Sequence, residues 1–332
     1  MARVAVQLTN FTGGELSPRL DGRNDLQKYS TGCKTLENMI IFPHGSAARR
    51  SGTQFVAEVK DSTKETRLIP FEFSTTQTYI LEFGNQYIRF FKDNGQILSS
   101  GSPYEISSPY LEAELFDIKF AQSADVMYLC HPNHPAKKLS RTGHTSWSLT
   151  SVDFTDGPYM DENISSTTIS TSAHTVGTGR TLTASSTTGI NDNTGFQTTD
   201  VGRLIRFRDG YGKITARTST TVVTIEILED MGSSSASANW SLGAFSETTG
   251  HPSCVTFFEQ RLVFAATLSQ PQTIFFSKSG DYENMDENRG GTIADDDAII
   301  YTIASNQVNA IRFMTATRTL IIGTAGGEFA VS

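Results

Sequence analysis

The sequence has few cysteines, no long hydrophobic run and no signal-like start. Cys33, Cys130 and Cys254 are its three cysteines in 332 residues. Three cannot all pair, so a disulfide framework is excluded and folding in a reducing compartment is expected. No segment approaches the roughly 18 apolar residues of a membrane-spanning helix, and the first residues lack the apolar core of a secretory signal. We therefore expect a soluble chain without a membrane span.

Excess positive charge is also missing. Lysine and arginine number 27 against 35 aspartates and glutamates, which gives a net charge of −8. No basic block is present, and such a block is the usual electrostatic footprint of phosphate binding. Tight, sequence-specific DNA binding is therefore not expected. An acidic surface can still line a passage through which nucleic acid moves without being held.

Motifs for catalysis and cofactor binding are absent as well. The sequence lacks a Gly-x-Ser-x-Gly elbow and a kinase motif set, and the glycine-rich stretch 323–329 has no phosphate-binding lysine. The stretch "SRTGHTSW" (140–147) resembles the Asp-containing turn of sialidase-like propellers but lacks the aspartate. We predict no catalytic residues and no cofactor.

A possible metal motif occurs in "CHPNH", which contains Cys130, His131 and His134. A closed zinc site needs four ligands, and no second Cys/His pair lies at matching spacing. Pro132 and Pro135 favour a rigid loop instead. No metal site is predicted here.

The strongest pattern is a repeat of short apolar strands separated by polar turns. Four related segments start at Phe73, Phe120, Phe257 and Phe313, which stand 47, 137 and 56 residues apart. Four-stranded propeller blades repeat every 40 to 50 residues or so. An insertion of about 90 residues would explain the long interval. The chain is therefore predicted to be mainly β, a β-propeller-like array of antiparallel blades with an insertion.

Composition locates that insertion independently. Residues 164–195 form a Ser/Thr/Gly-rich run, and the segments "VGRLIRF" and "GKITARTSTTVVTIEIL" follow, with alternating β-branched and apolar residues. Such alternation is typical of strands. We predict a small all-β domain over residues 158–246.

The region before the first repeat has a different pattern. Apolar residues fall there at three- and four-residue spacing, which predicts one face of a helix over about residues 25–39. Asn24 is a suitable N-cap, and Pro43 lies beyond the end. The residues of this face are Leu26, Tyr29, Cys33, Leu36 and Ile40.

These patterns divide the chain into four parts. Residues 1–60 form a helical or extended N-terminal arm, 61–157 the first part of the propeller, 158–246 the inserted domain and 247–332 the continuation of the propeller. The last part is expected to be incomplete at its C-terminus, because the final segment falls within an expected blade hairpin.

Two groups of charged residues are candidates for subunit contacts. Asp295, Asp296 and Asp297 could bind calcium or act as an acid/base pair, but the fixed oxygen spacing of a calcium loop is absent. A solvated or partner-facing loop is favoured.

Arg49 and Arg50 follow a loop, where paired arginines usually form ion pairs with carboxylates. A subunit contact is favoured over a nucleic-acid contact.

The stretch 11–56, "FTGGELSPRLDGRNDLQKYSTGCKTLENMIIFPHGSAARRSGTQFV", resembles the N-terminal region of the tail nozzle proteins of short-tailed bacteriophages, also called tail tubular protein B. The resemblance extends over most of the chain outside the insertion. Family members are usually longer. The residues most like the shared pattern, for which backbone or interface roles are expected, are Gly13, Gly14, Glu15, Ser17, Pro18, Arg49, Arg50 and Gly52.

The resemblance implies a structural protein of the virion tail, synthesised in the host cytoplasm. Such a subunit forms a hexameric ring with a propeller in each subunit, and the genome leaves through the ring without sequence-specific binding. Implied partners are other copies of the chain and the upstream tail adaptor. Separately, the many hydroxyl side chains and few charges of the inserted domain suggest a contact with tail fibres or with the host envelope. The family offers no catalytic residues to carry over.

One alternative function comes from the turn at 140–147 and the acidic loops. A propeller-type tail protein that binds or degrades host glycans would need two carboxylates about 5 to 10 Å apart in a concave site. Loss of glycan turnover on replacing Asp295, Asp296 and Asp297 with asparagine would support this alternative.

Overall fold

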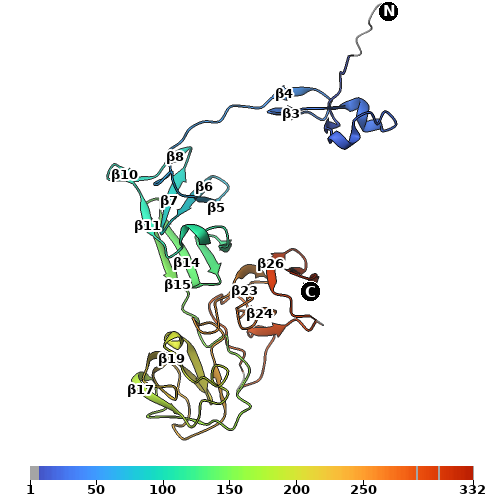
Figure 1. The fold of residues 1–332 in the computed structure, drawn as a ribbon. Coiled ribbons are helices and arrows are strands. Elements are labelled where there is room, and N and C mark those ends of the chain that lie inside the picture. The colour runs from blue at the N-terminus through green and yellow to red at the C-terminus, as the bar shows by residue number, and fades with distance from the viewer. Residues whose placement is uncertain (1–6, 289–290, 306, 332) are drawn as a thin grey trace, which may run out of the picture. The chain divides into compact units, whose positions relative to one another are not determined.

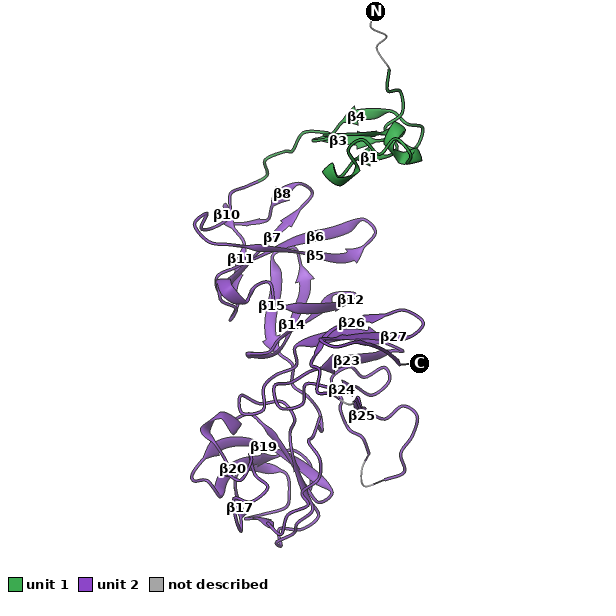
Figure 2. Ribbon diagram, turned by 45° about the vertical axis from the view of Figure 1, so that its right-hand side comes forward, with its two compact units in different colours: residues 1–56 green, residues 57–332 purple. Residues whose placement is uncertain are grey.

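The computed structural model describes residues 7–288, 291–305 and 307–331, and the protein is mainly β with several antiparallel sheets (Figure 1). The chain divides into two compact units, residues 1–56 and 57–332 (Figure 2). The predicted mainly-β class is therefore confirmed.

The first unit consists of short pieces joined by turns. Its two shortest strands pair in parallel, and the other two form an antiparallel hairpin. The elements are β1 (Gly14–Glu15), η1 (Pro18–Leu20), η2 (Gln27–Thr31), β2 (Gly32–Cys33), β3 (Met39–Ile41) and β4 (Ala47–Arg49). The two 3-10 turns η1 and η2 thus lie between β1 and β2.

The predicted helix over residues 25–39 is wrong. Only the 3-10 turn η2 is helical, and the backbone becomes extended at Gly32, which pairs with Gly14. A Cβ at Gly32 would lie 2.5 Å from the Leu16 side chain, so Leu16 would have to move to admit any other residue here. Asn38 has a positive φ of 57°, which also ends any helix. The helical spacing of apolar residues was therefore misleading.

The second unit begins with a five-stranded antiparallel sheet. Its first strand alternates buried and exposed residues, as a strand with one face on the core must. The five strands are β5 (Arg67–Ser74), β6 (Gln77–Gly84), β7 (Tyr87–Lys92), β8 (Gly95–Gln96) and β11 (Glu105–Ser107). A separate small hairpin, β9 (Leu98–Ser99) and β10 (Ser102–Pro103), lies between β8 and β11 in the sequence.

Three further antiparallel sheets have the strand order of the chain itself. The second sheet contains β12 (Lys119–Ser123), β13 (Val126–His131), β14 (His134–Gly143) and β15 (Ser146–Ser151). The third contains β22 (Cys254–Phe258), β23 (Arg261–Ala265), β24 (Thr273–Phe276) and β25 (Ile299–Thr302). The fourth contains β26 (Ile311–Ala316), β27 (Leu320–Thr324) and β28 (Glu328–Val331).

The first strands of these four sheets are neighbours. The Gln122 side chain on β12 exchanges two hydrogen bonds with the backbone of Glu72 on β5, at 2.9 and 3.1 Å. Strand β22 lies against β12 and also against β26. The four sheets therefore follow one another through their first strands.

Each pair of successive sheets shares its own apolar cluster. Phe71 and Trp147 belong to the cluster between the first and second sheets, where Trp147 also stacks on Phe90 at 4.5 Å. Tyr128 and Phe264 belong to a cluster shared by the second and third sheets. A further cluster joins the third and fourth sheets and includes Val263, Ile274, Leu320 and Ile322. The sheets are therefore packed face to face rather than joined edge to edge.

Between the second and third sheets lies a six-stranded sheet with a core of its own. It curls into a half-barrel, and Ile169 at one edge exchanges backbone hydrogen bonds of 2.8 and 2.9 Å with Ser237 near the other edge. Its strands lie within residues 158–246. They are β16 (Ile169–Thr171), β17 (Gly177–Ala184), β18 (Leu204–Phe207), β19 (Gly210–Arg217), β20 (Val222–Ile227) and β21 (Trp240–Leu242), and the 3-10 turn η4 (Thr198–Asp200) precedes β18.

Candidate functional site

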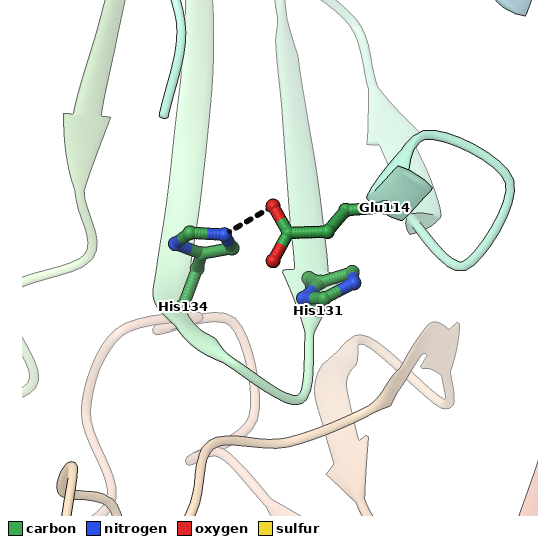
Figure 3. A group of neighbouring side chains, drawn as sticks. All are labelled: Glu114, His131 and His134. Atoms are coloured by element: carbon green, nitrogen blue, oxygen red, sulfur yellow. Dashed lines mark hydrogen bonds and ion pairs between the residues drawn. The ribbon is translucent and has the colours of Figure 1, made fainter. Parts of the chain in front are cut away.

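The most concentrated group of chemically versatile side chains lies at the end of the second sheet. His131 ends β13 and His134 begins β14, and the two residues are opposite each other in the hairpin register. Glu114 comes from the 3-10 turn η3 (Glu112–Glu114), between β11 and β12. Figure 3 shows the Glu114 carboxylate pointing toward the His134 imidazole, with His131 next to the Glu114 side chain.

The Glu114 carboxylate is held by several donors. Its Oε2 lies 2.8 Å from His134 Nε2 and accepts a 2.9 Å hydrogen bond from Leu111 N. Its Oε1 accepts a longer bond of 3.4 Å from Asn133 Nδ2. Asn133 N donates to Nδ1 of His131 at 3.2 Å. Turn η3 and the β13–β14 hairpin are thus tied together by these bonds.

Burial and charge act against each other in this cluster. Burial disfavours the charged form of Glu114, but the hydrogen bonds from Leu111 N, His134 and Asn133 outweigh it, so the Glu114 pKa is lowered. His131 is only 2% exposed, and burial lowers its pKa even though the Glu114 charge opposes that shift. Glu114 is therefore an anion next to a neutral His131 near pH 7.

Tyr110 completes the surroundings of the two histidines. Its ring packs edge-on against His134, with centroids 5.2 Å apart, and lies 6.2 Å from the His131 ring. Burial raises the Tyr110 pKa well above its usual value. The Tyr110 hydroxyl is buried and has no hydrogen-bond partner among the described residues.

In the part of the chain that the structure describes, this is the one group of three potential metal ligands, and the ligand atoms lie within 4.8 Å of one another. The sequence singled out His131 and His134 but missed Glu114, which lies seventeen residues before His131. A search for a second Cys/His pair could not find it. Only the fold of η3 against the hairpin brings this carboxylate to the histidines.

The two candidate arginines lie in the first unit, at the end of the β3–β4 hairpin. The Arg50 guanidinium donates to Asn38 Oδ1 at 2.6 Å and to the Ser51 carbonyl at 3.2 Å, so it closes its own hairpin. Arg49 pairs with Met39 through the backbone and is exposed. Arg49 is therefore the freer of the two for a contact with another subunit.

The candidate aspartates lie in the segment before β25 and bind a buried arginine through their backbone. Carbonyl oxygens of Asp295, Asp296 and Asp297 all accept hydrogen bonds from the Arg261 guanidinium. Side chains of Asp295 and Asp296 are exposed, whereas that of Asp297 is buried. The acidic segment thus has a structural role that the sequence did not indicate.

The Asp297 carboxylate shares a cation with Asp286. Lys278 Nζ lies 3.1 Å from Asp297 Oδ1 and 3.0 Å from Asp286 Oδ2. Ala294 N donates to Asp297 Oδ2 at 2.8 Å, and this bond, followed by the Lys278 contact, lowers the Asp297 pKa against the effect of burial. Asp297 is therefore an ion-paired anion in a closed turn.

A pH-dependent stability is expected from His251, in the loop before β22. Its backbone N donates to the Pro132 carbonyl at 3.3 Å, and its Nε2 lies 3.1 Å from Glu247 Oε1. Burial lowers the His251 pKa, although Glu247 opposes the shift. Below its ordinary pKa of 6.5, the unfolded chain therefore takes up a proton that the folded chain resists. Stability should fall as the pH drops through this range.

Urea unfolding at a series of pH values measures this dependence. A His251→Gln variant should lose stability less steeply on acidification than the unmodified chain, because it lacks the titrating group. An unchanged pH slope in that variant would contradict the assignment to His251.

No protein-family model matches this chain, and a search of curated proteins found no match either. Within the described residues, no helix has both the length and the apolar character needed to cross a bilayer. The function is therefore inferred from the geometry of the chain and from its sequence pattern.

Proposed function

We propose that this chain is a structural, non-enzymatic subunit of a bacteriophage tail nozzle of the tail tubular protein B type. In this proposal the four successive antiparallel sheets are the blades of a propeller, and the subunits form the ring through which the genome leaves. The observation that carries the proposal is the row of four sheets whose first strands are neighbours.

The packing of these sheets supports the blade interpretation. In a propeller, each small antiparallel sheet packs its face on the next, and the first strands lie nearest the central axis. Here each successive pair of sheets shares a separate apolar cluster, and β22 lies between β12 and β26. Both features are those expected of consecutive blades.

The position of the half-barrel supports the same arrangement. The second and third sheets are separated in sequence by residues 152–253, yet they share the cluster that contains Tyr128, Cys130, Phe264 and Phe275. The half-barrel has its own core and interrupts the chain without separating these two sheets. It is therefore available for contacts outside the blades, such as contacts with tail fibres.

Apolar side chains on the last two sheets and the segments next to them favour assembly with other copies. Singly exposed apolar residues are common, but several on neighbouring segments are typical of an interaction surface. Large apolar side chains exposed here are Ile293, Ile299, Tyr301, Val308 and Phe313. We place part of the contact between subunits on these sheets and another part on Arg49. The upstream tail adaptor is a separate proposed partner of the ring.

The native mass of the purified chain tests this assembly. The proposal predicts a closed oligomer, a hexamer, whose mass does not change on dilution. Tyr301→Lys and Phe313→Lys should dissociate it, because a buried lysine at a subunit contact is costly. Val176→Lys, an exposed position in the half-barrel, is the matched control and should not. Monomers at every concentration would contradict the proposal.

We expect the chain to bind duplex DNA weakly, whatever the sequence of the DNA. The net charge of −8 opposes the phosphate backbone, so a conduit built from such subunits lets DNA pass without trapping it. Mobility-shift titration at physiological salt, with a basic DNA-binding protein as positive control, measures this affinity. A tight complex at that salt concentration would show that the conduit account is wrong.

A further inference from the structure

We propose that Glu114, His131 and His134 bind one divalent transition-metal ion, with Zn²⁺ as the best match. The ion would fasten turn η3, which links the first two sheets, to the β13–β14 hairpin of the second sheet. The site would be independent of whether the chain forms a phage tail.

The ligand types and their separation favour this ion. Two imidazoles and one carboxylate are typical protein ligands of Zn²⁺, which usually takes four ligands in a tetrahedron. Ligand atoms around such an ion stand about 3.3 Å apart, as follows from bonds of about 2.0 Å. The three ligand atoms here lie within 4.8 Å of one another, and His134 Nε2 and Glu114 Oε2 are at 2.8 Å. Binding an ion would therefore need the ligand side chains to shift from their present positions.

The bonds that now hold the ligands are compatible with this change. When an ion binds His134 Nε2, the proton that this nitrogen donates to Glu114 is released to solvent or is carried by Nδ1 in the other tautomer of the ring. The bond from Asn133 N to His131 Nδ1 is 3.2 Å long, at the weak end of the normal range, so this donor competes only weakly with an ion for the ring nitrogen. Glu114 keeps its bond from Leu111 N, which fixes the carboxylate in place as supporting hydrogen bonds do in metal sites.

A second, independent observation concerns Tyr110, whose ring packs beside the cluster. The Tyr110 side chain is fully buried between the two histidine rings and the core, and its hydroxyl has no hydrogen-bond partner in the described chain. A buried unsatisfied hydroxyl is uncommon, and an ion or an ordered water is a usual explanation. Three protein ligands leave a fourth position that a water molecule would occupy.

The consequence for the fold is a cross-link between segments that are distant in sequence. Glu114 belongs to the connection from β11 to β12, whereas the histidines flank the β13–β14 turn of the second sheet. Anything that binds the folded state and not the unfolded one stabilises the fold. Zn²⁺ should therefore raise the melting temperature of the purified chain by a few degrees.

Calorimetric titration of the full, metal-stripped chain with Zn²⁺ tests the proposal, with Co²⁺ absorption as a spectroscopic check of tetrahedral coordination. The unmodified chain should bind one equivalent. Glu114→Gln and His134→Ala should each weaken binding by tenfold or more, since even supporting residues of metal sites cost 10- to 100-fold. Both should also lose the rise in melting temperature.

The matched control is His174→Ala. His174 also pairs with a carboxylate, Asp230, at 3.0 Å, but this exposed pair has no third ligand in the described chain. The control should bind Zn²⁺ like the unmodified chain.

Should His134→Ala fail to fold, the Glu114→Gln variant, which keeps the shape of the side chain, decides the test alone. The proposal is overturned by the absence of one-to-one binding at micromolar Zn²⁺, by binding unchanged in Glu114→Gln, or by equal loss in the control.

Discussion

Replacing Asp200 with alanine is expected to destabilise the half-barrel by about 3 to 5 kcal/mol. Asp200 and Arg203 form an ion pair of 2.9 Å in which both side chains are completely buried. Removing one partner leaves the other charge in the interior without compensation, and such losses are among the largest that single substitutions cause.

The surrounding hydrogen bonds explain why the effect should be large. Asp200 Oδ2 accepts from Gln197 N at 2.7 Å and from Asn191 Nδ2 at 2.6 Å. The Arg203 guanidinium also donates to the Gly243 carbonyl at 2.7 Å, which joins the turn before β18 to the end of β21. Burial lowers the Arg203 pKa, and Asp200 opposes the shift. Asp200 therefore stabilises both a buried cation and two partly buried donors.

Tryptophan fluorescence can follow this loss in the half-barrel alone. The chain has two tryptophans, so a Trp147→Phe background leaves Trp240, at 2% exposure in the half-barrel core, as the reporter during urea unfolding. The matched control is Asp153→Ala, which removes a solvent-exposed partner of Lys213 and should cost no more than about 1 kcal/mol. Equal effects of the two substitutions would contradict the role given to the buried pair.

Replacing Arg261 with methionine is expected to destabilise the third sheet by about 3 kcal/mol. Its guanidinium is buried and donates to the carbonyls of Ser277 at 2.7 Å and Asp297 at 2.6 Å, and also to that of Asp295. Methionine fills a similar volume but removes the donor from the buried carbonyls of Ser277 and Asp297. Hydrogen bonds from a charged donor are worth more than neutral ones, and losing several together exceeds the cost of one.

Two further substitutions separate the guanidinium from the acidic side chains. Arg261→Lys keeps the charge but cannot reproduce the planar fork, so an intermediate loss is expected. Asp295→Asn should be nearly neutral, because Arg261 contacts the carbonyl of Asp295 and not its carboxylate. Amide hydrogen exchange of β23 and β24 measures the loss, with exposed Arg318→Met as the control. A large effect of Asp295→Asn would mean that the side-chain charge matters more than the backbone contact.

Sequence reasoning succeeded where the pattern was local. The alternation predicted over residues 212–228 of the half-barrel follows from burying one face of each strand, and the paired strands there, β19 and β20, are close in sequence. It failed at residues 25–39, where apolar spacing suggested a helix but the close approach at Gly32 and the positive φ of Asn38 do not permit one.

The candidate site needed information that spacing cannot provide. His131 and His134 are visible as neighbours in the sequence, but Glu114 joins them only after η3 packs on the hairpin. Likewise, the sequence favoured a solvated or partner-facing loop for the acidic segment, and did not indicate that its carbonyls bind Arg261 from the third sheet. Both contacts depend on the packing of segments that no local pattern connects.

Electron microscopy of the purified full chain tests the central claim, a ring-forming structural subunit, most directly. The account predicts closed rings with an open centre, in which each subunit has a row of packed blades and a separate half-barrel. Uniform particles the size of one chain, with no rings at any protein concentration, would contradict it.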